Sequence, residues 1–282
     1  MHGKNLIWLA SYPKSGNTWV RLFLQHVLYG DPSPDGFPSP SAIPIASNRK
    51  LIDDMLGIRS GNLAEDEIEN LRPGVYREMA KKGDETRVIK VHDSYHLSPK
   101  GEALFPAEVS RKVIYILRNP LDLVVSYAFH SGKSFDRIIA QLNDPGFTIS
   151  GSKTGLRAQV RQKLGSWTQH VESWTRQSEI DVHILRFEDL LGDPAACFRT
   201  MLNAAAIPCE KDIFEEALRA TAFDRLREKE QRYGFREKPL QAASFFRKGK
   251  SGDFGAHLNK AQIRKVLDVH GPMMEQYAYP VI

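Results

Sequence analysis

The start of the chain has the pattern of a β-strand, a tight loop and an α-helix in succession. Leu6–Ser11 is an apolar run of strand length, and the loop after it contains Pro13 and Gly16, which are typical turn residues. From Thr18 onward the apolar residues recur at helical spacing until Gly30 ends the pattern. The chain therefore opens with a strand–loop–helix unit.

The loop of this unit is a candidate anion site. Free backbone N–H groups and the positive end of the helix dipole meet at a helix N-terminus, and this arrangement binds phosphate or sulfate groups. Lys14 adds a charge, Ser15 and Thr18 add hydroxyl donors, and Gly16 lets the backbone approach an anion. The Walker pattern GxxxxGK[ST] is absent, because Lys14 precedes the glycine. The alternative interpretation is an ordinary turn with a surface lysine.

Apolar strands alternate with helices along the rest of the chain. Further strands are predicted at Thr86–His92, Arg111–Pro120 and Asp181–Leu191. The predicted helices begin near Glu65 with Asn62 as N-cap, and cover Leu121–Gly132, Leu156–Arg176, Asp193–Ala205, Asp212–Thr221 and Lys260–Tyr277. This alternation favours an α/β fold with a central parallel sheet flanked by helices. No change of composition divides the chain, so we predict a single domain over residues 1–282.

The composition narrows the classes of function. Of the 282 residues, 41% are hydrophobic and 26% are charged, which excludes a disordered or fibrous chain. Cys197 and Cys209 are the only cysteines and indicate a reducing compartment, and no apolar run is long enough to span a bilayer. We therefore expect a cytoplasmic protein with no membrane partner. The net charge of +5 fits solubility or an anionic ligand, and no motif points to nucleic acid.

Three motifs resemble those of sulfotransferases that use 3′-phosphoadenosine 5′-phosphosulfate (PAPS). Residues 12–19 (YPKSGNTW) resemble the family's 5′-phosphosulfate loop, with Asn17 where the family usually has threonine. Residues 111–130 resemble the element for the 3′-phosphate, a strand ending in Arg-Asn-Pro followed by a helix with a serine. Residues 245–254 (FFRKGKSGDF) resemble the RKGxxGDW segment, with Phe254 in place of tryptophan. The resemblance implies the cytosolic-type fold with a P-loop-like donor site, and the compact length resembles bacterial members.

The middle motif has a physical basis for nucleotide binding. Arg118 follows a buried strand, so it emerges at the carboxyl edge of the sheet, where open α/β sheets bind ligands, and its planar guanidinium suits a phosphate. Without the resemblance, a structural ion pair would explain Arg118 equally well. The resemblance implies a donor-binding set of Lys14, Ser15, Gly16, Asn17, Thr18, Trp19, Arg118, Ser126, Phe187, Thr221, Phe223, Arg247, Lys248 and Gly249.

Lys90 and His92 end the second predicted strand and are candidate catalytic residues. The motif KVH resembles the family's Lys-Thr-His, whose histidine is the general base, and an imidazole can take a proton from a hydroxyl near neutral pH. The resemblance implies in-line transfer of a sulfuryl group from PAPS to a hydroxyl of a small-molecule acceptor. Lys14 would neutralise the leaving oxygen, Lys90 would assist the sulfuryl oxygens, and Ser126 would hold Lys14 until an acceptor binds. No metal ligand set is predicted.

Three other functions compete with this interpretation. A P-loop-type nucleotide phosphotransferase (a kinase) would share the anion loop but would need the missing Walker lysine. A non-catalytic nucleotide- or sulfate-sugar-binding module would leave Lys90 and His92 without a purpose, and a nucleic-acid binder would show steep salt dependence. The acceptor and the oligomeric state stay open. We expect the acceptor pocket to be lined by Asp31–Pro44, Asp93–Leu97 and Ala128–Leu156.

Overall fold

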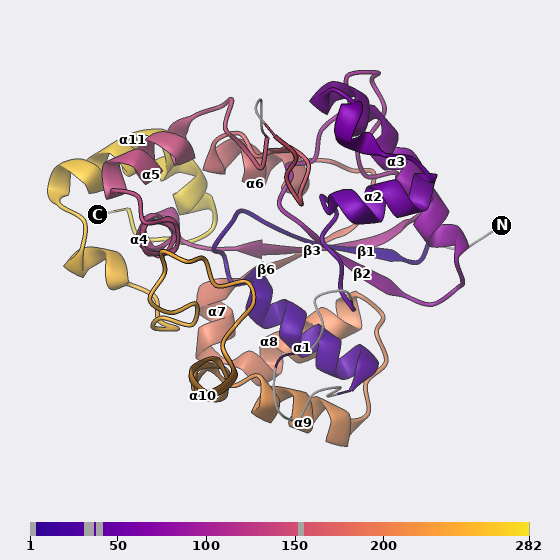
Figure 1. The fold of residues 1–282 in the computed structure, drawn as a ribbon. Helices are drawn as coiled ribbons and strands as arrows, with labels where there is room; N and C mark the ends of the chain where they lie inside the picture. The colour runs from indigo at the N-terminus through magenta and orange to yellow at the C-terminus, as the bar shows by residue number, and fades with distance from the viewer. Residues whose placement is uncertain (1–3, 31–36, 38–41, 152–154, 282) are drawn as a thin grey trace.

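In the part of the chain that the structure describes, four parallel strands form the central sheet. This computed structural model describes residues 4–30, 37, 42–151 and 155–281, so most of Asp31–Pro44, which was expected to line the acceptor pocket, lies outside the described residues. The order across the sheet is β2 (Arg87–Val91), β1 (Leu6–Ser11), β3 (Ser110–Leu117) and β6 (Val182–Arg186). Helices cover both faces of the sheet (Figure 1), which confirms the predicted α/β class.

Alternation along the strands divides the core between the two faces. Trp8 of β1 packs with residues of α3 (Glu65–Lys81) and α6 (Trp167–Thr175), whereas Leu9 packs with residues of α1 (Asn17–Tyr29). Both side chains have no exposed surface. The helices α8 (Pro194–Ala204) and α9 (Lys211–Ala220) complete the layer on the side of α1. Because strands buried on both faces must be apolar throughout, the sequence pattern follows from this layered arrangement.

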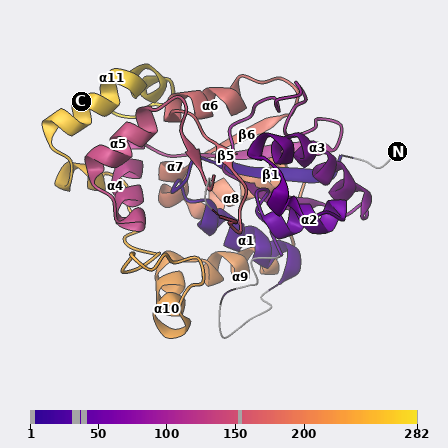
Figure 2. The same cartoon turned by 45° about the horizontal axis from the view of Figure 1, so that its top comes forward.

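The remaining described elements include short helices and a second, two-stranded sheet. They are α2 (Arg49–Leu56), η1 (Ser60–Asn62), α4 (Pro120–Ser131), α5 (Phe135–Asn143), β4 (Thr148–Ile149), β5 (Gln162–Lys163), α7 (Phe187–Gly192), α10 (Phe223–Tyr233), η2 (Asp253–Ala256) and α11 (Lys260–Gln276). The segment between α10 and η2, drawn in orange, runs back toward α4 in both views (Figures 1 and 2). None of the described helices is long and apolar enough to cross a membrane.

The helix predicted over Leu156–Arg176 is wrong in its first half. Only α6, from Trp167 onward, is helical, and the residues before it are extended. Gln159 forms an antiparallel bridge with Asn48, and Gly165, with φ of +66°, then turns the chain into α6. The apolar pattern of this stretch therefore predicted the helix correctly from Trp167 onward. It failed in the first half, where the backbone pairs with another segment instead.

Two smaller boundaries also differ from the prediction. The N-cap of α3 is Ala64 and not Asn62, which lies in η1, and the backbone N–H of Ala64 donates to the Glu67 carboxylate at 2.8 Å. The strand predicted over Asp181–Leu191 stops at Arg186, and a short helix begins at the next residue. The helices α2, α5 and α10 were not predicted; with 8, 9 and 11 residues they do not exceed the shortest window, about 11–18 residues, in which a helical period is recognised.

The register of the sheet brings the ends of all four strands to one edge. Ser11 pairs with Ile116, Ala10 pairs with Val91, and Leu117 pairs with Arg186. The residues that follow these strands are the predicted anion loop, His92, Arg118 and Phe187. Because ligands of open parallel sheets bind beyond the carboxyl ends of the strands, this edge is the candidate functional site.

Candidate active site

A cavity of about 1250 Å³ opens at the carboxyl edge of the sheet. Its wall includes most of the residues predicted to bind the donor or to catalyse transfer, namely Lys14, Gly16, Asn17, Thr18, Trp19, Lys90, His92, Arg118, Ser126, Phe187, Phe223, Arg247, Lys248 and Gly249. Ser15 and Thr221 are buried but do not line it, and the Thr221 hydroxyl donates to the Ala217 carbonyl at 2.6 Å. Residues from both ends of the chain therefore form one site.

The anion loop has a strained backbone that neighbouring side chains support. Lys14 adopts a φ of +73°, and its carbonyl oxygen accepts a hydrogen bond from Arg118 at 2.8 Å. Gly16 has a φ of +102°, and a Cβ built on it would lie 2.5 Å from the Phe187 ring. The guanidinium of Arg118 also stacks on that ring, 4.4 Å from its centroid. The loop conformation thus requires glycine at position 16 and is fixed by Arg118 and Phe187 together.

Several buried donors in and behind the loop have no partner among the described residues. They are the hydroxyl of Ser15, the indole N–H of Trp19 and Nε of Arg118. A buried donor without a partner costs free energy, so such groups are usually satisfied by a ligand or water. Together with the free N–H groups at the start of α1, they fit a ligand that carries phosphate or sulfate.

Asn17, where the sequence departs from the family pattern, has a structural contact. Its amide donates to the Leu9 carbonyl at 3.0 Å and to the Ser11 hydroxyl at 3.1 Å. The side chain therefore ties the first turn of α1 to the end of β1. Asparagine at this position keeps the geometry of the loop and leaves its backbone N–H at the helix N-terminus.

Lys14 is held in the cavity by residues of α4 and of the segment after α10. Its Nζ lies 3.2 Å from Nδ1 of His130 and 4.4 Å from the centroid of the Phe245 ring. Burial, and then the positive charge of Arg118, lowers the pKa of Lys14 to about 7. Ser126 has its predicted place on the cavity wall, but the side chain that contacts Lys14 is His130, which the motif comparison did not identify.

His92 has a fixed orientation, and among the described residues no hydrogen bond to its Nε2 is formed. Its Nδ1 lies 2.8 Å from the carbonyl oxygen of Ser11, which can only accept, so Nδ1 carries the proton. The carbonyl oxygen of His92 itself accepts from Nε2 of His170 at 3.0 Å. Burial, and then the charge of Lys90, lowers the pKa of His92 well below its usual value. Nε2 is therefore a neutral lone-pair acceptor, as a general base requires.

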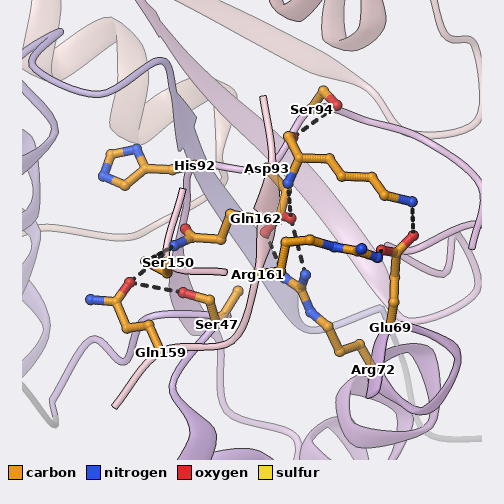
Figure 3. A network of polar contacts seen from close by, with 12 residues as sticks. Ser47, Glu69, Arg72, His92, Asp93, Ser94, Ser150, Gln159, Arg161 and Gln162 are labelled. Carbon is orange, nitrogen blue, oxygen red and sulfur yellow. Dashed lines mark hydrogen bonds and ion pairs between the residues drawn. The ribbon is translucent and has the colours of Figure 1, made fainter. Parts of the chain in front are cut away.

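A buried ion pair fixes the backbone next to His92. Arg72 of α3 donates to both carboxylate oxygens of Asp93, at 3.0 and 2.6 Å, and both side chains are 1% exposed. The indole of Trp174 donates to the carbonyl oxygen of Asp93 at 3.0 Å. Figure 3 shows this pair beneath the end of the strand that carries His92. The geometry of the candidate base is thus set by residues that do not touch the cavity.

A second polar network lies beside His92. The Oε1 atom of Gln159 accepts from the Ser47 hydroxyl at 3.1 Å and from Nε2 of Gln162 at 3.0 Å. The amide of Gln159 and the imidazole of His92 extend to the same side of this network (Figure 3), and both residues line the cavity. The place of Gln159 on the cavity wall was not predicted, because the stretch from Leu156 was assigned to a helix.

The predicted acceptor wall is correct only in part. His130, Ile149 and Ser150, from the predicted range 128–156, line the cavity, but the described residues of Asp93–Leu97 do not. Ala42 and Pro44, from the predicted range Asp31–Pro44, line it as well, and so do Leu51 and Met55 of α2, which were not predicted. The unpredicted helix α2 therefore contributes two apolar side chains to the cavity wall, together with Lys50 and Asp54.

Lys90 faces a carboxylate that the sequence analysis missed. Its Nζ lies 3.8 Å from the Glu237 carboxylate, which is also ion-paired with the buried Arg21 of α1. Burial, and then the charge of Arg21, lowers the pKa of Lys90 to about 8, although Glu237 opposes this shift. No local signal marks Glu237, because it lies in an irregular segment outside every motif.

Two motifs meet at the opposite side of the cavity. The carboxylate of Asp122, which follows the Arg-Asn-Pro element, accepts from the backbone N–H groups of Gly252 and Phe254 at 2.6 and 3.0 Å. Asp253 pairs with Arg247 and Lys248, at 2.5 and 2.6 Å. These two cations are therefore already placed on the cavity wall. Gly249 is needed there, because a Cβ on it would lie 2.4 Å from the Phe223 ring.

The fold and the site define a class of protein: an α/β protein with a candidate anion loop and a candidate base, His92, on the wall of one cavity. The sulfotransferase domain family matches residues 4–278, and the chain belongs to that family. Human sulfotransferase 1C2 is 26% identical over 276 residues, which cover 95% of this chain and 82% of the relative. Zebrafish cytosolic sulfotransferase 1 is 26% identical over 277 residues, with the same coverage. These findings favour a sulfotransferase over the kinase alternative.

Solved structures with low sequence identity share the fold. Mouse sulfotransferase SULT7A1, complexed with PAP (3′-phosphoadenosine 5′-phosphate), matches with a TM-score of 0.58 and 19% identity, over 96% of this chain and 85% of that one. Retinol dehydratase, in complex with androsterone and the inactive cofactor PAP, matches with a TM-score of 0.64 and 16% identity, over 99% of this chain and 83% of that one.

Proposed function

We propose that this sulfotransferase transfers the sulfuryl group of PAPS to a hydroxyl of a small-molecule acceptor. The products would be a sulfate ester and 3′-phosphoadenosine 5′-phosphate (PAP). The observation that carries the proposal is that Lys14, His92 and Arg118 line one cavity although they follow three different strands. The PAP complexes of proteins with the same fold support the identity of the donor.

The donor half of the cavity suits a nucleotide with two anionic ends. The loop around Lys14 and the N-terminus of α1 would hold the 5′-phosphosulfate. Arg118, with Arg247 and Lys248, would hold the 3′-phosphate, because guanidinium and ammonium groups pair strongly with phosphate oxygens. Asp253, which pairs with both Arg247 and Lys248 and leaves a net positive charge, would then share these cations with the ligand.

The chemical step follows from the orientation of His92. Its Nε2 would accept the proton of the acceptor hydroxyl as that oxygen forms a bond to sulfur and the bond from sulfur to the bridging oxygen breaks. The electron pair of the broken bond stays on the 5′-phosphate of PAP, where the ammonium of Lys14 would neutralise it. Lys90 would stabilise the sulfuryl oxygens. Such a transfer depends on positioning and electrostatics and needs no covalent intermediate.

The lining of the cavity supports a second small molecule beside the donor. Outside the loop and the cationic residues, the wall includes the apolar side chains of Leu51, Met55 and Ile149 and the amide of Gln159. We further propose that residues 1–282 act as one domain, and that the protein works in the cytoplasm, in keeping with its two free cysteines.

Calorimetric titration with PAP, and with ADP in the presence and absence of Mg²⁺, tests the donor assignment. We expect tight binding of PAP alone, and a loss of about 10- to 100-fold in Lys14→Ala, because a charge-assisted contact is removed. Lys211→Ala, an exposed lysine on α9, is the matched control and should bind PAP as the wild type does. Metal-dependent ADP binding without preference for the 3′-phosphate would contradict the proposal.

A transfer assay then tests the reaction itself. PAPS is incubated with a panel of phenols, alcohols and sugars, and PAP release is compared with the appearance of a sulfated product. Equal amounts of PAP and sulfate ester, unaffected by EDTA, are the expected result. PAP binding without turnover on any acceptor of the panel would favour a binding module instead.

A further inference from the structure

The ammonium of Lys14 lies between two side chains that no motif assigns. His130 is in the last turn of α4, and its Nδ1 is 3.2 Å from Nζ of Lys14. The Phe245 ring lies 4.4 Å from the same Nζ, and it meets the His130 ring edge-on with 5.8 Å between centroids. Two segments, each more than 100 residues from Lys14 in the chain, thus both contact its ammonium group.

The protonation states at this contact are set by chemistry. An ammonium group has donors only, so Nδ1 of His130 must be the unprotonated nitrogen of a neutral imidazole. Burial, and then the charge of Lys14, lowers the pKa of His130 to about 4, so the ring is neutral at physiological pH. The contact is therefore a hydrogen bond from a charged donor to a neutral acceptor, which is stronger than one between neutral groups.

The surroundings of Lys14 otherwise disfavour its charge. The groups that face it are cationic on three elements, and one carboxylate opposes them: Arg118 after β3, Lys90 on β2, Arg247 and Glu237 in the segment after α10. Burial adds to this effect and lowers the pKa of Lys14 to about 7. A neutral acceptor is the kind of partner that favours the charged form without adding a second charge to an anion site.

We propose that His130 is a positioning residue for Lys14, and that its Nδ1 keeps the lysine charged and directed into the donor cavity. Ser126, to which the family resemblance assigns contact with Lys14, lies one helical turn earlier on the same helix and lines the same cavity. No hydrogen bond joins Ser126 to Lys14 in the part of the chain that the structure describes. The contact between His130 and Lys14 does not depend on the proposed function, but its effect on donor binding and catalysis does.

The contact is tested by measuring the pKa of Lys14 in the free protein. Lysine labelled with ¹³C at Cε is titrated by NMR, and the Lys14 signal is assigned by its loss in Lys14→Ala. His130→Leu removes the acceptor at similar size, whereas His130→Asn places an amide oxygen near the position of Nδ1. We expect the Lys14 pKa to fall in His130→Leu and to return toward the wild-type value in His130→Asn. Equal pKa values in wild type and His130→Leu would overturn the proposal.

PAP affinity as a function of pH provides a second readout. At pH 6, about one unit below the wild-type pKa of Lys14, the difference in PAP affinity between wild type and His130→Leu should shrink to about twofold or less. At pH 7.5 we expect His130→Leu to bind roughly three- to tenfold more weakly, and His130→Asn to recover most of the loss. A purely structural defect would weaken binding equally at both pH values and would count against the proposal. The phosphate groups of PAP also titrate in this range, but they do so equally for all variants, so the comparison between variants is unaffected.

The two proposals fail in different ways. If wild-type protein does not bind PAP, the proposed function is wrong, and the NMR titration still decides whether His130 controls Lys14. If PAP binds and is turned over but Ser126→Ala, rather than His130→Leu, shifts the Lys14 pKa, the positioning role belongs to Ser126. Thermal unfolding of each variant confirms that folded proteins are compared.

Discussion

The imidazole Nδ1 of His92 lies 2.8 Å from the carbonyl oxygen of Ser11, the last residue of the neighbouring strand. Since a carbonyl oxygen cannot donate, this one contact fixes both the tautomer and the direction of the ring. Nε2 remains as the basic atom, and it belongs to a residue on the cavity wall. The parallel pairing of β1 and β2 is what places these two residues together.

Replacement of His92 should abolish turnover without abolishing donor binding. We expect His92→Ala to lower kcat by about 10²- to 10⁴-fold, which is the usual contribution of a general base. The Kd for PAP should stay within about threefold of wild type, because no donor contact is assigned to the imidazole. His96→Ala is the control in the same segment, since His96 pairs with Glu69 outside the cavity. Near-normal kcat in His92→Ala would remove this residue from the role of base.

The pH dependence of kcat/KM for PAPS should fall on the alkaline side first. Lys14 must be charged to bind the donor, and its pKa is lowered to about 7, so donor capture should weaken as the pH rises through 7. The pKa of His92 is lowered well below 6.5, so this base stays neutral, and activity should persist down to mildly acidic pH. Initial rates at limiting PAPS between pH 5 and 9, at constant ionic strength, measure both limbs.

Lys14→Arg separates the alkaline limb from other titrations. A guanidinium stays charged over this whole range, so the decline through pH 7 should disappear even if kcat is lower, and only a decline near pH 8 from Lys90 should remain. Persistence of the same decline in Lys14→Arg would assign it to another group.

The close approach of Gly16 to the Phe187 ring predicts a severe effect of alanine. Gly16→Ala combines a positive φ with a Cβ 2.5 Å from that ring, so we expect loss of more than about 2 kcal/mol of stability and at least tenfold weaker PAP binding. Gly57 has a similar backbone strain at φ of +66° but no atom within 4 Å of the added Cβ. Gly57→Ala should therefore cost only about 1 kcal/mol and leave PAP affinity unchanged. Equal effects of both variants in urea unfolding and calorimetry would contradict the close-contact explanation.

The buried ion pair between Arg72 and Asp93 should be required for stability. Asp93→Asn leaves a buried guanidinium without its counter-charge, and such changes cost about 3–5 kcal/mol. Asp268→Asn breaks an exposed i,i+4 pair with Arg264 on α11 and should cost about 0.3–0.5 kcal/mol. Denaturant titration gives both values. A change below 1 kcal/mol in Asp93→Asn would show that the buried pair contributes little.

Local patterns in the sequence were sufficient to predict the strand–loop–helix unit and the strands of the sheet that follow it. Apolar runs such as Leu6–Ser11 that alternate with helical segments are typical of a parallel sheet buried on both faces, so the α/β class was predictable. The residues after those strands reach the same edge in any such sheet, which is why Lys14, His92 and Arg118 could be expected together. The Leu156–Arg176 helix failed, because its apolar stripe could not reveal that Gln159 pairs with Asn48.

The sequence by itself thus determined the class of the fold, the anion loop and the candidate base, since these depend on short-range periodicity and on motifs. The tertiary structure alone decided which side chains surround them. His130 reaches Lys14, and Glu237 reaches Lys90, across more than 100 residues of chain. Such contacts depend on how helices and irregular segments pack over the sheet edge, and that packing is a sum of many weak long-range interactions with no local signature.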